Sequence, residues 1–263
     1  MNRIKLILAA LVTGTLLVPA LAFAQDANVS ITASVNASST APHSATLSAA
    51  LTTAKSRADQ EITRRITAMN ALLTRVNAMT RVDASFKTTL AANIQIQITA
   101  LTALQATIDS DTTASTLKVE IQSITKSYRI FALVLPQANI GAAADRVQTV
   151  SGLMLTLSSK LSSRLASSTT TDNASSSAAL ADANAKIADA QLQATASIGH
   201  IAGLQPDNGN KTTMAANTAA LKLARADIKV AQQDLAAARK DFASVMGALH
   251  VQGSVEASST VQH

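Results

Sequence analysis

Apolar residues recur every three or four positions along most of the chain, a spacing that places them on one face of an α-helix. The first run covers 44–76, and later runs cover 86–108, 117–135, 140–165, 180–201 and 221–249. We therefore expect an all-α protein with six amphipathic helices. The apolar face of the first predicted helix is formed by Leu47, Leu51, Ala54, Ala58, Ile62, Ile66, Met69, Leu73 and Val76.

Breaks between these runs carry residues that end or begin helices. The first break lies at 81–85, and Asp111 or Thr112 is the expected N-cap of the third helix. Pro136 is expected to end or kink that helix, because proline lacks a backbone donor and disfavours helix at the residue before it. The Ser/Thr-rich segment 167–177 is typical of a linker, and 203–209 is typical of a turn.

The last apolar run has strictly alternating spacings of three and four residues, and every second position in its first part is alanine. This is a heptad pattern, and small side chains in it let two helices approach closely. We expect the fifth and sixth helices to form an Ala-rich, coiled-coil-like antiparallel hairpin over 178–250, after an elongated four-helix bundle over 44–166. Because alanine buries little surface, we expect the hairpin to be stabilised by packing on the bundle or by self-association as a homo-oligomer.

The N-terminal segment 1–24 has the pattern of a signal peptide. Arg3 and Lys5 precede an apolar stretch over 6–18, and Ala22 and Ala24 offer the small residues that a signal peptidase reads. We expect cleavage before Gln25, with an uncleaved membrane anchor as the alternative. After cleavage we expect no transmembrane segment, a disordered leader over 25–43, a disordered tail over 251–263, and an exported protein that is extracellular, on the cell surface or periplasmic.

Composition excludes several classes of chemistry. The chain has no Cys and no Trp, so disulfides, Cys-ligated metals and thiol nucleophiles are impossible. One Tyr and 4 Phe provide too few rings for a base-stacking platform, and we expect no nucleic-acid partner. The 4 His residues show no metal-ligand spacing and no catalytic motif is present, so we expect neither a metal or other cofactor nor a catalytic site.

Positive charge is concentrated in the middle of the chain. Residues 55–165 contain 13 basic and 7 acidic side chains, whereas 166–263 contain 7 and 8. This excess favours anionic partners, with an ordinary solvated helix surface as the alternative. The candidate basic surface consists of Arg57, Arg64, Arg65, Arg75 and Arg81.

A second candidate segment contains the only Tyr of the chain. Lys126, Tyr128, Arg129 and Phe131 form either a docking point or a plug of large side chains in the bundle core. We favour the core plug, because Tyr128 and Phe131 lie on the same face of the predicted helix.

Three segments carry a resemblance to known proteins: 58–80 (ADQEITRRITAMNALLTRVNAMT), 126–136 (KSYRIFALVLP) and 206–241, which begins PDNGNKTTMAANTAALKLARAD. Together they resemble a group of exported, Ala/Thr-rich helical proteins of candidate-phyla bacteria with reduced genomes. The resemblance covers most of residues 50–250 and implies export and a helical fold. It implies no activity, because none is known for the group.

These observations predict an exported, noncatalytic structural or interaction protein of the bacterial envelope or cell surface. Its long helical faces are expected to contact envelope proteins or anionic cell-surface polymers. The alternative is an extracytoplasmic holdase-type chaperone with basic helical arms.

Overall fold

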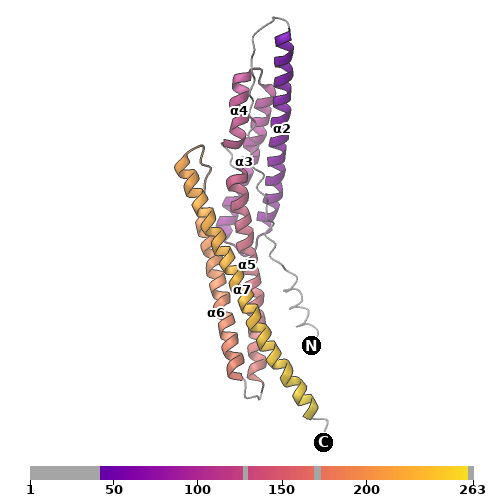
Figure 1. Cartoon of the computed structure of the whole chain (residues 1–263), viewed down its shortest axis with the longest axis vertical. Coiled ribbons are helices and arrows are strands. Elements are labelled where there is room, and N and C mark those ends of the chain that lie inside the picture. The colour runs from indigo at the N-terminus through magenta and orange to yellow at the C-terminus, as the bar shows by residue number, and fades with distance from the viewer. Residues whose placement is uncertain (1–41, 127–129, 169–172, 260–263) are drawn as a thin grey trace. The chain divides into compact units, whose positions relative to one another are not determined.

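The protein is all-α over the residues that the computed structural model describes, which are 42–126, 130–168 and 173–259. Its elements are α2 (Pro42–Asn77), α3 (Ala84–Ser110), α4 (Ala114–Lys126), a short π-helix η1 (Ile130–Val134), α5 (Leu135–Ala166), α6 (Asn173–Ile201) and α7 (Lys211–Ser259) (Figure 1). The predicted signal peptide and most of the predicted leader lie outside the described residues. None of the described helices combines the length and apolar character that a membrane crossing requires.

Helix α2 confirms the first predicted helix, but its buried face differs from the expected one. The buried positions follow alternating spacings of four and three residues: Ala58, Ile62, Arg65, Met69, Leu72 and Val76. Ile66 and Leu73, which were expected on this face, are half-buried beside it. The buried stripe is therefore shifted by one residue at these two positions, and an arginine occupies one of the core positions.

The loop between α2 and α3 is held by one carboxylate from α5. Oδ1 of Asp145 accepts hydrogen bonds from the backbone N–H groups of Thr80 (2.7 Å), Arg81 and Val82 (3.2 Å). Asp83 then caps α3 by accepting from the backbone N–H groups of Ser85 and Phe86. The break predicted at 81–85 is found at 78–83, and its conformation depends on a residue more than sixty positions away.

Phe86 packs directly against the backbone of α5. Its ring lies so close to Gly141 that a Cβ atom added there would be 3.0 Å from the ring. A larger residue at position 141 would therefore require the Phe86 ring to move by a few tenths of an ångström, and this contact places the start of α3 on the first turns of α5.

The segment around Pro136 is helical on both sides of the proline. The π-helix η1 precedes α5, and Pro136 lies in the first turn of α5. A first-turn proline fits there, because the backbone N–H groups of that turn need no partner within the helix. At the position of the expected break, the chain therefore changes from a π-helix to the new α-helix α5.

Helix α5 packs against both α6 and α7 (Figure 1). The buried amide of Gln137 donates to the carbonyl of Ile201 at 2.7 Å, and Gln148 donates to the carbonyl of Gln191 at 3.1 Å. The chain divides into the units Met1–Ala45 and Thr46–His263, and α5, α6 and α7 belong to the second. The predicted linker 167–177 therefore connects helices that pack on one another, and α6 begins within it at Asn173.

Helices α6 and α7 run in opposite directions in one fixed register. Lys186 on α6 pairs with Asp241 on α7 at 2.8 Å, and His200 approaches Asp227 at 3.3 Å. Lys186 precedes His200 by two heptads, whereas Asp241 follows Asp227 by two heptads. The same heptad alternation of three and four residues therefore runs through both helices without a slip.

The buried seam between α6 and α7 alternates large and small side chains. The seam positions of α6 are Leu180, Ala183, Ile187, Ala190, Ala194, Ser197 and Ile201, and those of α7 are Leu221, Ala224, Ile228, Ala231, Leu235, Ala238, Phe242 and Val245. The register sets Phe242 opposite Ala183 and Leu235 opposite Ala190. Ala194 lies opposite Ala231, so the two backbones can approach most closely at that layer.

The predicted turn at 203–209 is confirmed. Asp207 Oδ1 accepts from the backbone N–H of Gly209 at 2.9 Å, and Asn208 and Gly209 have φ angles of 49° and 86°. Asparagine and glycine tolerate this left-handed conformation better than other residues. The side chain of Asn210 then caps α7 by accepting from the backbone N–H groups of Thr212 and Thr213.

The C-terminal end of α7 differs from the expected one. The helix continues to Ser259, whereas a disordered tail was expected from 251. The segment 251–259 contains no proline, and its one glycine, Gly253, weakens a helix without ending it.

Candidate interaction surface

Helix α2 presents a row of arginines on its exposed side. Arg57, Arg64 and Arg75 are exposed and lie seven and eleven residues apart, close to two and three full turns. At a rise of 1.5 Å per residue, neighbouring members are separated by roughly 10 and 16 Å along the helix. Arg81 is exposed in the loop that follows, so four of the five arginines predicted for a basic surface are exposed.

Arg65 is the exception, because only 3% of its side chain is exposed. It occupies a core position of α2, where its guanidinium pairs with Glu61 at 2.7 Å and lies 4.8 Å from the centre of the Phe131 ring. The expectation of Arg65 on a basic surface is therefore wrong. The reason is the shifted buried stripe of α2, which places position 65 inside and position 66 at its edge.

Arg64 contacts the same two side chains from the exposed side. It donates two hydrogen bonds to Glu61, at 2.8 and 2.9 Å, and its guanidinium lies 4.3 Å from the Phe131 ring centre. The side chain of Arg64 is 54% exposed. The structure thus joins one residue of the predicted docking segment to two residues of the predicted basic surface.

Glu61 is the anionic centre of this group. Its burial would raise the pKa of the carboxyl group, but hydrogen bonds and charges from Arg64 and Arg65 outweigh that effect and hold the pKa below its ordinary value. Glu61 therefore stays ionised and neutralises part of the charge of the two arginines. The free positive charge of the arginine row lies mainly at its two ends.

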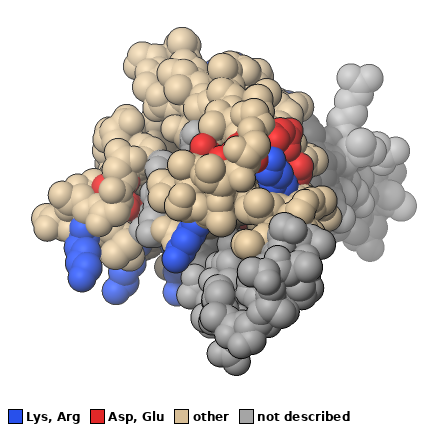
Figure 2. Space-filling model, turned by 90° about the horizontal axis from the view of Figure 1, so that it is seen from above, with Lys and Arg blue, Asp and Glu red and all other residues tan. Residues whose placement is uncertain are grey.

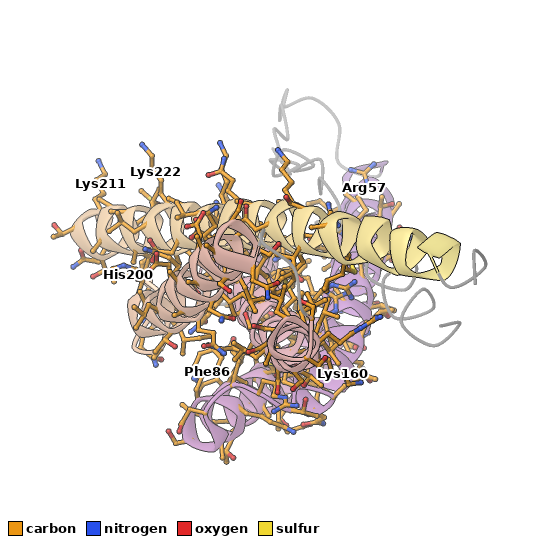
Figure 3. All side chains as sticks on the ribbon, turned by 90° about the horizontal axis from the view of Figure 1, so that it is seen from below. Arg57, Phe86, Lys160, His200, Lys211 and Lys222 are labelled. Atoms are coloured by element: carbon orange, nitrogen blue, oxygen red, sulfur yellow. The ribbon has the colours of Figure 1, made fainter. Side chains whose placement is uncertain are left out.

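The other arginines have different local roles. Arg75 donates to the side-chain oxygen of Asn139 on α5, and Arg81 is fixed through its backbone N–H to Asp145. For Arg57 the structure places the side chain on the exposed side of α2 (Figure 3). The row is therefore anchored at Arg64 and Arg75.

The predicted docking segment is described only in part. Lys126 is the last residue of α4, and Phe131 lies half-buried in η1. Tyr128 and Arg129 lie outside the described residues. The choice between a docking point and a core plug therefore stays a prediction for the segment as a whole.

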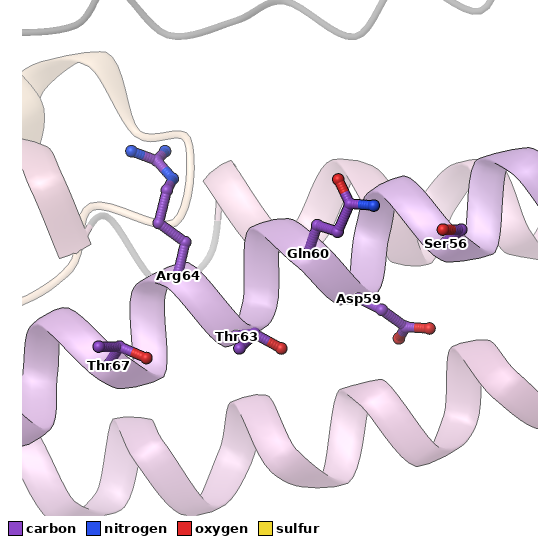
Figure 4. Close-up of a pocket in the computed structure, with 6 residues that line it drawn as sticks. All are labelled: Ser56, Asp59, Gln60, Thr63, Arg64 and Thr67. Carbon is purple, nitrogen blue, oxygen red and sulfur yellow. The ribbon is translucent and has the colours of Figure 1, made fainter.

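A shallow hollow follows the arginine row on α2 (Figure 4). It is lined by Ser56, Asp59, Gln60, Thr63, Arg64 and Thr67. Asp59 accepts a hydrogen bond from Gln105 of α3 at 3.2 Å and so also connects two helices. The lining offers hydroxyl, amide and guanidinium groups, which suit hydrogen bonding to a polar partner.

The uncharged part of this surface was not predicted from the sequence. Ser56, Gln60, Thr63 and Thr67 recur with spacings of four, three and four residues, which is a helical stripe of polar side chains. The same periodicity that marks an apolar face would have identified it. Within the described ranges, His, Asp and Glu side chains do not gather in groups of three that could hold a metal ion.

Comparison with known proteins found no match to this chain. No protein-family model matches the chain, and neither a curated protein nor a solved structure matches it. The resemblance to exported proteins of reduced-genome bacteria therefore stays a prediction.

Proposed function

We propose that this chain is an exported, noncatalytic structural or interaction protein of the bacterial envelope or cell surface. It contacts envelope proteins or anionic polymers through its helical faces. The observation that carries the proposal is the exposed face of α2, where Arg57, Arg64 and Arg75 follow one line beside a stripe of polar side chains.

The spacing of this face suits an extended partner. The Cα atoms of the three arginines are roughly 10 and 16 Å apart along the helix, so one small anion cannot contact all three, whereas a chain with repeated anionic groups can. Guanidinium groups bind phosphate and carboxylate oxygens in a planar, two-bond geometry, and the adjacent hydroxyl and amide groups can bind neutral parts of the same partner. Binding of this kind weakens as salt rises.

The proposed architecture follows the predicted boundaries. Residues 44–166 form a four-helix bundle, and 178–250 form an Ala-rich antiparallel hairpin of coiled-coil type that packs on α5. The alternation of alanine with larger residues along the seam supports the hairpin. The proposed location is extracellular, on the cell surface or periplasmic, which rests on the signal-peptide pattern of 1–24.

The polymer contact is tested by titrating the full chain into fluorescent inorganic polyphosphate and measuring anisotropy. The double variant Arg57→Gln/Arg75→Gln should bind about tenfold more weakly, since each exposed charge contact contributes up to about 1 kcal/mol. The matched control Arg146→Gln/Arg164→Gln removes the same charge from exposed positions of α5 and should bind like the wild type.

A broader assay covers protein partners. The full chain is immobilised and exposed to cell-wall fractions and envelope extracts at physiological salt. If it retains neither an anionic polymer nor an envelope protein, and polyphosphate does not bind, the proposed function is wrong.

A further inference from the structure

Helix α7 carries a second cationic row that the sequence analysis did not identify. Lys211, Lys222, Lys229 and Lys240 are separated by eleven, seven and eleven residues, so they lie along one side of the helix over roughly 43 Å. All four are exposed. Figure 3 shows Lys211 and Lys222 extending in the same direction, away from the other helices.

These lysines differ in their surroundings from three other lysines of the chain. Lys55 and Lys87 donate to backbone carbonyls, and Lys186 binds Asp182 and Asp241. Among the described residues, no ion pair or side-chain hydrogen bond involves a member of the α7 row. Four ammonium groups are therefore exposed without a neutralising partner from this part of the chain.

The three aspartates of α7 lie on a different edge. Asp227, Asp234 and Asp241 recur every seven residues on the edge that faces α6, where His200 and Lys186 approach two of them. Figure 2 shows basic side chains projecting together from one side of the molecule, with acidic side chains set back from it. Positive and negative charges are thus separated, although their numbers in 166–263 almost balance.

The spacing of the row favours an extended partner over a small anion. The Cα atoms of neighbouring lysines are roughly 10 or 16 Å apart along the helix, so one phosphate cannot contact the whole row. A lysine acts as a hydrated point charge and does not impose the planar two-bond geometry of arginine. The complementary partner is an extended anionic object.

Exposed apolar side chains on the same helix indicate which extended object fits. Leu223 and Val230 directly follow Lys222 and Lys229, and they are 53% and 40% exposed. They lie roughly 100° around the helix from the lysines, so the lysine row and these apolar side chains border the outward side of α7 from its two flanks. A polyanion in water would not cover them, whereas the boundary between headgroups and acyl chains of a bilayer accepts both ammonium groups and aliphatic side chains.

We propose that the outward face of α7 docks on an anionic lipid surface. Lys211, Lys222, Lys229 and Lys240 contact headgroup phosphates, and Leu223 and Val230 enter the boundary below them. The contact is peripheral and runs parallel to the membrane. It uses a different helix and a different partner from the α2 surface proposed above, so either proposal can fail alone.

The test is flotation of the full chain with vesicles of phosphatidylglycerol and phosphatidylcholine in varied ratio. Vesicles of pure phosphatidylcholine are the control for binding through the apolar segment 6–18, because that binding does not depend on lipid charge. The quadruple variant Lys211→Gln/Lys222→Gln/Lys229→Gln/Lys240→Gln removes the row. The matched control Lys118→Gln/Arg146→Gln/Lys160→Gln/Arg164→Gln removes the same charge elsewhere, at exposed positions.

We expect the charge-dependent part of vesicle affinity to fall at least a hundredfold in the row variant, at about fivefold per lysine. The vesicle affinity of the control variant should fall by less than a third as much on a logarithmic scale. The helicity of both variants, measured by circular dichroism, should be unchanged. Equal losses in the two variants would overturn the proposal, because they would reflect net charge alone.

A second variant separates lipid from polymer. Leu223→Gln/Val230→Gln keeps every lysine and should still weaken binding to phosphatidylglycerol vesicles about tenfold, because it removes the apolar part of the contact. If this variant binds the vesicles as the wild type does, Leu223 and Val230 do not enter the bilayer boundary and the proposal is wrong. If the row binds soluble polyphosphate and no vesicle, the partner is a polyanion and the proposal is also wrong.

Discussion

Substitution of Asp145 provides the sharpest test of how this fold is held together. One oxygen of its carboxylate accepts three consecutive backbone N–H groups, from Thr80, Arg81 and Val82, and so fixes the loop between α2 and α3 on α5. Asp145→Ala removes the acceptor and leaves these donors without their protein partner. Asp145→Asn keeps one oxygen in place but removes its charge.

The magnitude follows from the number and kind of these hydrogen bonds. Each hydrogen bond to a charged group contributes about 1.5–3 kcal/mol to stability. Here three hydrogen bonds share one oxygen, and Asp145 is half-exposed, so water can take over part of the hydrogen bonding in the variant. We expect Asp145→Ala to lower the free energy of unfolding by about 3 kcal/mol. Asp145→Asn should cost about half of that, because neutral hydrogen bonds are roughly half as strong as charged ones.

Urea unfolding followed by circular dichroism measures the loss, and amide hydrogen exchange locates it. The amides of Thr80, Arg81 and Val82 should lose protection in Asp145→Ala, and those of α6 and α7 should exchange as before. Arg146→Ala is the control, because it truncates the exposed neighbouring side chain and should change stability by less than about 0.5 kcal/mol. Wild-type stability in Asp145→Ala, with unchanged exchange at the three amides, would refute the assigned role.

Three further predictions concern α2 and α7. Arg65→Ala should lower stability by about 2 kcal/mol in urea unfolding through lost packing and stacking, and Arg65→Met should restore at least half of that loss. The folded-state pKa of Glu61 lies below its unfolded value, so stability should fall as pH drops below about 4.5, and Glu61→Gln should show a shallower acid loss between pH 6 and 3. Ala231→Leu overpacks the seam and should lower the melting temperature, at a cost of about 1–3 kcal/mol, whereas the exposed Ala226→Leu should leave it unchanged. An unchanged melting temperature in Ala231→Leu would show that the helices are not closely packed there.

The helices and their ends were predictable because the signals for them are local. Apolar spacing identified the six α-helices that the structure describes, and the glycine and asparagine residues at 203–209 identified the turn between α6 and α7. The break at 81–85 was predicted from the loss of periodicity alone. What periodicity could not show is that Asp145, on a helix much later in the chain, fixes that break.

The site residues were less predictable, because burial depends on which of two neighbouring positions faces inward. Ile66 is more apolar than Arg65, so periodicity favours position 66, yet the structure buries Arg65 against Phe131 and Glu61. At α7 the number of charged residues was misleading for a different reason. Nearly equal numbers of basic and acidic residues suggest a neutral surface, whereas helical geometry puts the lysines on one side and the aspartates on another.

The fixed register of α6 and α7 determines where the chain can change in length. The Lys186–Asp241 ion pair and the His200–Asp227 contact are separated by whole heptads, and the large residues of the seam face small ones, so insertions within either helix keep this pairing in steps of seven residues. An insertion of two or five residues, by contrast, would rotate the remainder of the helix by roughly 140–200° and turn the lysine row of α7 toward α6 or α5. The turn around Gly209 has no such constraint, so an epitope tag or fluorescent label placed there should leave both helical faces as they are.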